Sequence, residues 1–184
     1  MRAEYPQMRT TMSKYFTIFA AWCLVPTDGY RRIPCLPTGD PITLHISTDF
    51  PPDHSATIRD AAGAWNSALG REALVVVPST FAEVRAWDGR SIIQATDEGG
   101  GSTSHIIAYG VAGWVRTDTD VRLWNGLEGA ALYNVALHEF GHVLGLDHSV
   151  PGTAMGYVLR LGPDRRPLPV GTISLGWDDV VGAW

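Results

Sequence analysis

The chain has 184 residues, which fits one domain with a short additional segment but hardly two domains. It is 45% hydrophobic and 10% aromatic, and its mean hydropathy is near zero, as in a globular protein with a buried core. Acidic residues number 19 and basic residues 14, without any basic cluster, so the electrostatic pattern of a nucleic-acid binder is missing. The two cysteines are too few for a disulfide scaffold.

The first forty residues differ in composition from the rest of the chain. An apolar run at 15–25 follows several basic residues, and four prolines stand between residues 26 and 41. The run is shorter than the about 20 residues of a membrane span, and it fits either a signal peptide or an ordinary buried segment. We expect a leader and an extended linker at 1–40, with a possible signal peptide at 1–22, before a domain at 41–184.

The domain begins with a predicted strand and a predicted helix. Residues 42–46 alternate between apolar and polar side chains, as a half-buried strand does. Between residues 58 and 69, apolar side chains recur with helical spacing along one face. Asp53 or Ser55 is the expected cap at the start of this helix, and Gly70 is its expected end.

Strands and helices continue to alternate along the rest of the chain. Further strands are predicted at 73–77, 92–95, 105–109 and 121–124, with a glycine-rich loop at 99–102. A long helix is expected at 127–144, and a short one from Ser174 to the C-terminus. This order predicts a single α+β (α/β-like) domain.

The second expected helix carries the motif His-Glu-x-x-His-x-x-Gly-x-x-His. His138 and His142 are four residues apart, so both imidazoles lie on one helical face and can reach one cation. A helix commonly ends at a glycine such as Gly145, and the chain reversal there can bring His148 to the same point. Three imidazoles and one open position form a zinc site of the catalytic type, beside which Glu139 would flank the bound water.

These residues resemble the signature of the metzincin zinc endopeptidases, most closely a small bacterial-type matrixin. Ser149 after the third histidine, Met155 in a following turn, and the pair Asp178-Asp179 near the C-terminus are also similar to matrixins. The resemblance implies a twisted, mostly parallel five-stranded sheet with two long helices. A small C-terminal subdomain would follow, with a methionine-containing turn and a final helix, in which the acidic pair anchors that turn.

The resemblance also implies the roles of the site residues. His138, His142 and His148 would bind one catalytic Zn²⁺, which lowers the pKa of a bound water to about 7. Glu139 would be the general base that takes a proton from this water. Met155 would support the imidazoles from beneath as an apolar group rather than a ligand.

A protein or peptide is the implied substrate, bound in extended form beside an edge strand at 105–109 or near Gly113. Neither a nucleic-acid partner nor a stable membrane span is expected, and the protein is expected to be a monomer. Secretion to the extracellular space fits the resemblance, with tethering through an uncleaved N-terminal segment as the alternative.

Three features depart from the matrixin pattern. Matrixins usually carry Tyr-Pro after the turn methionine, whereas Gly156 stands here between Met155 and Tyr157. This spacing is similar to that of astacins and serralysins, which implies that Tyr157 is a catalytic residue stabilising the oxyanion; a place in the pocket wall or core is the alternative.

The second departure concerns additional ions. Neither the ligands of a second, structural zinc nor calcium loops are recognisable, so Ca²⁺ is possible but unsupported. His105, Asp97 and Glu98 are the nearest candidates, and we interpret them as ordinary strand and loop residues.

The third departure concerns the cysteines. Cys23 and Cys35 could form a disulfide in an oxidising compartment or stay inert thiols. Cys35 is faintly similar to the propeptide cysteine that blocks the zinc of matrixins, but the Arg-Cys-Gly core is absent. An active enzyme without a zymogen step is therefore the simpler expectation.

Two other function classes compete with a peptidase. One is a zinc-binding module of the same fold that cleaves nothing, against which Glu139 beside an open metal position argues. The other is a hydrolase of a non-peptide amide, which fold analogy alone disfavours.

Overall fold

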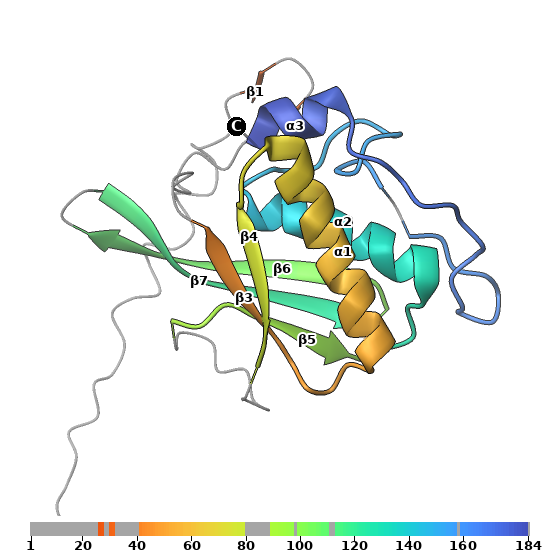
Figure 1. The fold of residues 1–184 in the computed structure, drawn as a ribbon. Coiled ribbons are helices and arrows are strands. Elements are labelled where there is room, and N and C mark those ends of the chain that lie inside the picture. Colours follow the sequence, from red (N-terminus) through yellow and green to blue (C-terminus); the bar gives the residue numbers. More distant parts are fainter. Residues whose placement is uncertain are drawn as a thin grey trace, which may run out of the picture.

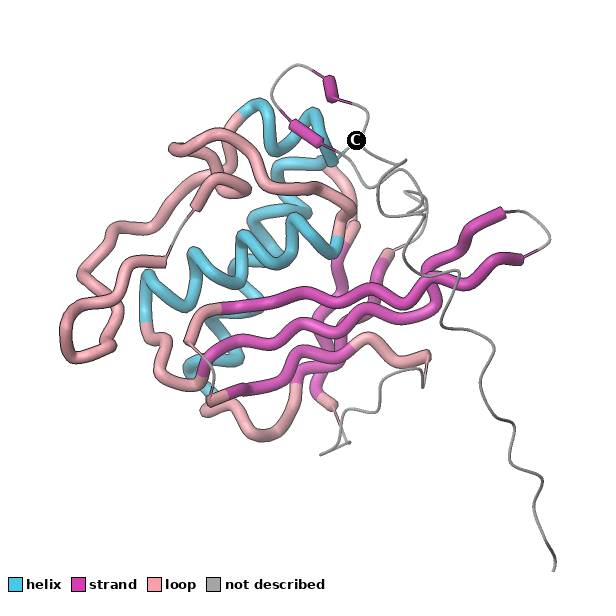
Figure 2. The backbone as a smooth tube through the Cα atoms, turned by 180° about the vertical axis from the view of Figure 1, so that it is seen from behind, coloured by secondary structure: helices cyan, strands magenta, loops and turns pink. Residues whose placement is uncertain are grey.

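In the computed structural model, the described residues are 26–27, 30–31, 41–79, 89–97, 99–110, 113–157 and 159–183. Two long helices cover one face of a twisted five-stranded sheet, as the views from opposite sides show (Figures 1 and 2). The possible signal peptide at 1–22, Cys23, Cys35 and Glu98 lie outside the described residues.

The strand order of the sheet is β4-β3-β5-β7-β6. Three of its pairings are parallel, and β6, at one edge, runs antiparallel to β7. The strands are β3 (Ile42–Ile46), β4 (Leu74–Pro78), β5 (Ile92–Thr96), β6 (Gly101–Gly110) and β7 (Gly113–Trp124). The predicted mostly parallel, five-stranded sheet is thus confirmed.

The hairpin of β6 and β7 differs most from the prediction. Both strands are longer than the segments expected at 105–109 and 121–124, and Gly101 and Ser102, expected in a loop, begin β6. Gly101 lies opposite Leu123 in the antiparallel ladder. This pairing overrides the weak strand propensity of glycine and serine, which is why the local sequence predicted a loop.

The first long helix, α1 (Pro52–Leu69), turns its apolar face to the core as expected. Its end at Gly70 is confirmed, because Gly70 has the left-handed φ of 63° that commonly closes a helix. The expected cap at Asp53 or Ser55 is wrong. Pro51 is the cap residue, without a side-chain hydrogen bond, and the fixed φ of the following proline starts the helix instead.

The second long helix, α2 (Gly129–Val143), contacts both α1 and β6 and is almost completely buried. Trp65 of α1 is fully buried and donates its indole N–H to the carbonyl oxygen of Leu137 at 2.9 Å. Core residues of the sheet, such as Val121 and Leu123, belong to the same apolar cluster. Because α2 is packed on two sides, the side chains of its last turns have fixed positions.

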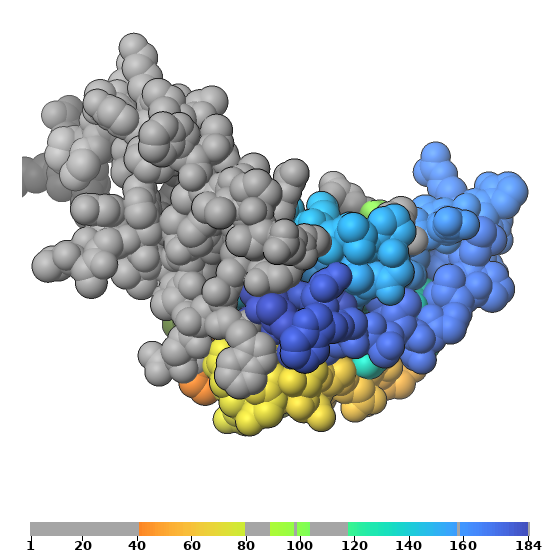
Figure 3. Space-filling view, turned by 90° about the horizontal axis from the view of Figure 1, so that it is seen from above, coloured from red at the N-terminus to blue at the C-terminus, as the bar shows by residue number. Residues whose placement is uncertain are grey.

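The residues after α2 form the small C-terminal subdomain. In the space-filling view they appear in blue as one contiguous body beside the yellow end of α1 (Figure 3). The subdomain ends in α3 (Trp177–Ala183), which begins later than the expected Ser174 and contacts both α1 and β2. Within the predicted linker, β1 (Pro26–Thr27) and β2 (Tyr30–Arg31) pair in antiparallel fashion.

Candidate metal centre

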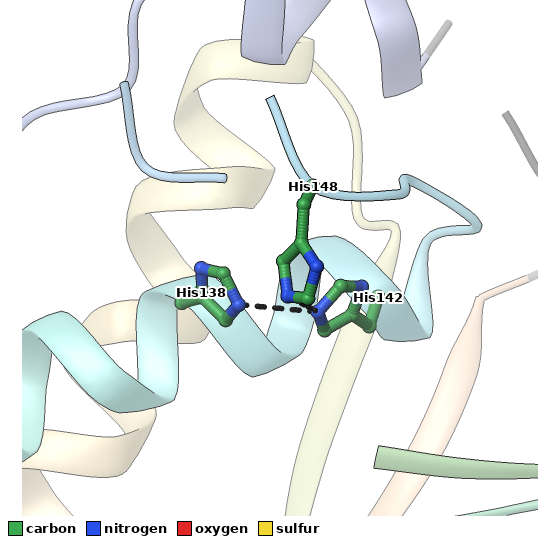
Figure 4. A group of neighbouring side chains, drawn as sticks. All are labelled: His138, His142 and His148. Atoms are coloured by element: carbon green, nitrogen blue, oxygen red, sulfur yellow. Dashed lines mark hydrogen bonds between the residues drawn. The ribbon is translucent and has the colours of Figure 1, made fainter. Parts of the chain in front are cut away.

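The three histidines of the motif meet at the C-terminal end of α2 (Figure 4). His138 and His142 project from successive turns of the helix, which ends at Val143. Gly145 then adopts a φ of 91°, a conformation that suits glycine, and the chain turns back to bring His148 over the helix. His138 is buried, His142 is half-buried and His148 is exposed, so the group is open to solvent from one side.

Hydrogen bonds fix the tautomers of the two helical imidazoles. The Nδ1 atom of His138 lies 2.9 Å from the carbonyl oxygen of Ala154, and that of His142 lies 2.8 Å from the carbonyl oxygen of Leu146. A carbonyl oxygen can only accept, so each Nδ1 carries the proton and each Nε2 presents a bare lone pair.

These bare nitrogen atoms converge on one point. The Nε2 atom of His142 lies 3.1 Å from that of His138 and 3.3 Å from that of His148. The two helical Nε2 atoms have no proton to share, so their contact in Figure 4 is not an ordinary hydrogen bond. Two nitrogen ligands of one tetrahedral zinc ion lie about 3.3 Å apart. The donor set therefore fits zinc.

Burial keeps the helical imidazoles neutral. It lowers the pKa of His138 from 6.5 to about 4, against an opposing contribution from the hydrogen bond to Ala154. Burial likewise lowers the pKa of His142. Protons therefore compete poorly with a metal ion at these nitrogen atoms near neutral pH.

A buried carboxylate on α3 holds the turn that contacts His138. Asp179 is 1% exposed, and its oxygen atoms accept hydrogen bonds from the backbone N–H groups of Ala154 at 3.0 Å and of Met155 at 3.2 Å. A third bond, of 2.8 Å, comes from the N–H of Gly176. Because the carbonyl oxygen of Ala154 accepts from His138, Asp179 orients this imidazole through one intervening residue. Of the acidic pair, Asp179 is thus the member that anchors the turn.

Met155 lies in the turn after α2 and packs closely against that helix. It is 2% exposed, and a Cβ atom placed on Gly141 would overlap its Sδ atom and come within 3.2 Å of the Trp65 ring. Any side chain at position 141 would therefore displace Met155 from its contact with α2. Sequence analysis missed Gly141, because this steric requirement arises only when the turn folds back onto α2.

Glu139 is buried between α2 and β6. It is 5% exposed, and the hydroxyl of Thr103 donates a 2.7 Å hydrogen bond to its Oε2 atom. Burial raises the pKa of Glu139 to about 7, although the bond from Thr103 acts in the opposite direction. Sequence analysis missed Thr103, since the register of the hairpin alone brings it to Glu139.

A family model of the matrixins matches residues 48–183. This chain belongs to the matrixin family. It is 32% identical over 131 residues to stromelysin-3 of Rattus norvegicus, a match that covers 60% of this chain and 25% of that protein. It is 31% identical over 156 residues to matrix metalloproteinase-20 of Homo sapiens, covering 73% of this chain and 30% of that protein. The chain thus spans less than a third of the length of these relatives.

Solved structures also match this matrixin, and one of them is a fish protease. High choriolytic enzyme 1, a hatching enzyme zinc-protease from the medaka fish Oryzias latipes, is 18% identical with a TM-score of 0.36. The match covers 58% of this chain and 44% of that chain. Matrixins are zinc proteases, and the triad of His138, His142 and His148 could bind one Zn²⁺ in this member.

Gly156, which stands between Met155 and Tyr157 where matrixins usually carry Tyr-Pro after the methionine, is required for a steric reason. A Cβ atom on Gly156 would overlap the backbone carbonyl of Val150, so the turn can pack only with glycine at this position. The Tyr157 hydroxyl is buried and has no hydrogen-bond partner among the described residues. Burial raises its pKa, with a smaller opposite contribution from Asn134, which itself binds the backbone of Gly171 and Ile173. A catalytic role of Tyr157 stays a prediction.

The candidates for further ions have ordinary roles where the structure describes them. Asp97 accepts a 2.6 Å hydrogen bond from the side-chain amide of Asn125. The side chain of His105 lies outside the described part of the chain, where its strand β6 is defined by its backbone. Among the described residues, the histidine triad is the one cluster of metal-ligating side chains.

Proposed function

We propose that this matrixin is a zinc-dependent endopeptidase that hydrolyses peptide bonds in proteins, with Glu139 as its general base. The convergence of the Nε2 atoms of His138, His142 and His148 on one point, with Glu139 directly after His138 in the same helix, supports this function most directly. A purely structural zinc site would use a fourth protein ligand, and none is present among the described residues around these nitrogen atoms.

His138, His142 and His148 would hold the zinc ion, which supplies Lewis acidity by lowering the pKa of a coordinated water and polarising a carbonyl group. Glu139 would accept the proton of the attacking water and deliver it to the leaving amine. Met155 would form the apolar floor under the imidazoles, and the proposed part of Tyr157 is to stabilise the negative charge on the carbonyl oxygen.

The substrate would lie along the free edge of β6. This strand pairs on one side with β7, and no strand among the described residues pairs with its other side, where an extended peptide can add as a further strand. Because such pairing depends on the substrate backbone more than on its side chains, it suits protein substrates.

We further propose that the protein acts outside the cell as a monomer. No helix in the described part of the chain is long and apolar enough to cross a membrane.

A comparison of the purified protein with its Glu139→Ala variant tests this function. Both proteins are incubated with casein or a quenched peptide library, with and without a zinc chelator, and their bound zinc is measured. We expect one zinc per chain in both proteins and cleavage by the wild type alone, abolished by the chelator. Stoichiometric zinc without cleavage by either protein would instead indicate a non-catalytic binding module.

A further inference from the structure

Strand β6 contacts the carboxylate of Glu139, the proposed general base. The sequence motif on α2 gives no indication of this contact. In the ladder with β7, Gly101 lies opposite Leu123 and Thr103 opposite Val121. Leu123 and Val121 are both fully buried on the face that α2 covers. Side chains alternate along a strand, so Gly101 and Thr103 face α2 as well, and a shift of one residue would turn both away.

Thr103 forms a hydrogen bond with the side chain of Glu139. Its Oγ1 atom lies 2.7 Å from the Oε2 atom of Glu139 and 3.2 Å from the backbone carbonyl oxygen of the same residue. A hydroxyl has one proton to donate, and a bond to a carboxylate is shorter and stronger than one to a neutral carbonyl. The shorter distance therefore identifies Oε2 as the acceptor.

Gly101 allows the backbone of β6 to approach the side chain of Glu139 closely. A Cβ atom at this position would stand 2.7 Å from Oε1 and 2.9 Å from Cγ of Glu139, and 2.6 Å from Val135. The backbone of β6 thus lies directly against the side chain of Glu139, which has contacts with this strand at both oxygen atoms. Rotation of the carboxylate is restricted by these contacts.

We propose that Thr103 is the positioning residue of the general base: its hydroxyl holds Oε2 and thereby leaves Oε1 to receive the proton of the attacking water. This inference rests on the proposed function, because it concerns the base of that reaction. Thr103 itself touches neither zinc nor the reacting atoms. Strand β6 would bind substrate along its free edge and would hold Glu139 through the residues that face α2. The substrate and the general base would thus be positioned by the same strand.

Thr103→Val tests the proposal because it replaces the hydroxyl with a methyl group of similar size. We expect kcat to fall about 10- to 100-fold with KM within about 3-fold, since misplacing an acid–base group costs part of its 10²–10⁴-fold contribution. Thr103→Ser, which keeps the hydroxyl, should restore kcat to within about 3-fold. Thr43→Val is the matched control, because Thr43 is exposed on strand β3. All four proteins should bind one zinc per chain. Thr103→Ala replaces the valine variant if the latter does not fold.

A second measurement uses the zinc-free protein and does not depend on activity. We expect Thr103→Val to lower the urea midpoint of unfolding when Glu139 is present, and to leave it unchanged or raised in the Glu139→Ala background. Such coupling identifies a direct interaction between the two side chains.

The outcomes are separable. Unchanged kcat in Thr103→Val, an equal loss in Thr103→Ser, a loss confined to KM, or additive effects on the urea midpoint would each overturn the positioning role. A wild-type protein without peptidase activity would overturn the proposed function and the catalytic part of this inference together. The urea measurements would then still report whether the contact exists.

Discussion

The region from α2 to α3 and the hairpin of β6 and β7 contribute to one site in different ways. The first region contains the three histidines, Glu139 and Met155 in a short stretch of sequence. The hairpin contributes Gly101 and Thr103, whose neighbours in space are set by strand register. Local motifs thus determine which groups are present, and the hairpin determines how one of them is held.

The largest expected effect concerns the anchor of the first region. Asp179→Ala removes the acceptor of three backbone N–H groups, two of them in the turn that contacts His138. We expect the free energy of unfolding to fall by about 5 kcal/mol, because each of the three hydrogen bonds to this carboxylate is worth at least about 1.5 kcal/mol. Zinc affinity should fall about 10- to 100-fold as His138 loses its oriented partner. Urea unfolding and zinc competition measure both effects.

The neighbouring carboxylate provides the control for this prediction. Asp178 is half-buried in the same first turn of α3, and Asp178→Ala should cost less than about 1 kcal/mol. Equal losses in the two variants would mean that the acidic charge of the turn, rather than the hydrogen bonds of Asp179, stabilises the subdomain.

The contact between the two regions should appear in the pH dependence of stability. In the zinc-free protein the pKa of Glu139 is about 7, against an ordinary value of 4.5. Between these pH values the folded protein keeps a proton that the unfolded chain has lost, so raising the pH destabilises the fold. Relative to Glu139→Gln, the wild type should lose about 3 kcal/mol of unfolding free energy from pH 4.5 to 7.

This measurement needs the variant as its reference. The pKa of His138 is lowered to about 4, so its contribution to stability increases with pH over much of the same range. Both proteins contain His138, and its contribution cancels in the difference between them. Parallel stability curves for the two proteins would show that Glu139 is not desolvated by β6.

A smaller effect is expected at the contact between Gly141 and Met155. Gly141→Ala should destabilise the protein by about 2 kcal/mol, because overpacking a core commonly costs 1–3 kcal/mol. Gly63→Ala on α1 should do the opposite and stabilise by about 0.5–1 kcal/mol, since nothing lies within 4 Å of its added Cβ. Met155→Ala should remove most of the cost of Gly141→Ala if that cost comes from their overlap. Thermal unfolding of these variants measures each change in stability.

The smallest effect concerns the contact between β7 and Ser91, the residue that precedes β5. The Oγ atom of Ser91 accepts a 3.0 Å hydrogen bond from the backbone N–H of Thr119 in β7. Ser91→Ala should cost about 1 kcal/mol, the usual net value of such a bond. Ser102→Ala, at an exposed position of β6, should change stability by less than about 0.5 kcal/mol in the same thermal measurement.

The sequence predicted most accurately those features that depend on the residue pattern of a single element. The face of α1, the end of that helix at Gly70, and the meeting of the three histidines all follow from helical spacing and from glycine conformation. The predicted acidic anchor also has a structural counterpart, although only the fold distinguishes Asp179 from Asp178.

The hairpin was predicted least well, for a physical reason. Asp118, Thr119 and Asp120 are all buried in β7, so the alternation that indicates a half-buried strand is missing from its sequence. Pairing between distant residues sets the length and register of both strands. For the same reason Thr103 was not recognised, because nothing near it in the sequence indicates a carboxylate 36 residues away.

The alternation of β6 has a consequence for how this matrixin can vary during evolution. Replacement of Gly101 or Thr103 would disturb the carboxylate, while the intervening Ser102 points away from it and is exposed. Tolerance to substitution should therefore rise and fall from one residue to the next along this stretch of the strand. Under the proposed function, new substrate preferences could then arise by mutation at outward positions while Gly101 and Thr103 keep their contacts with Glu139.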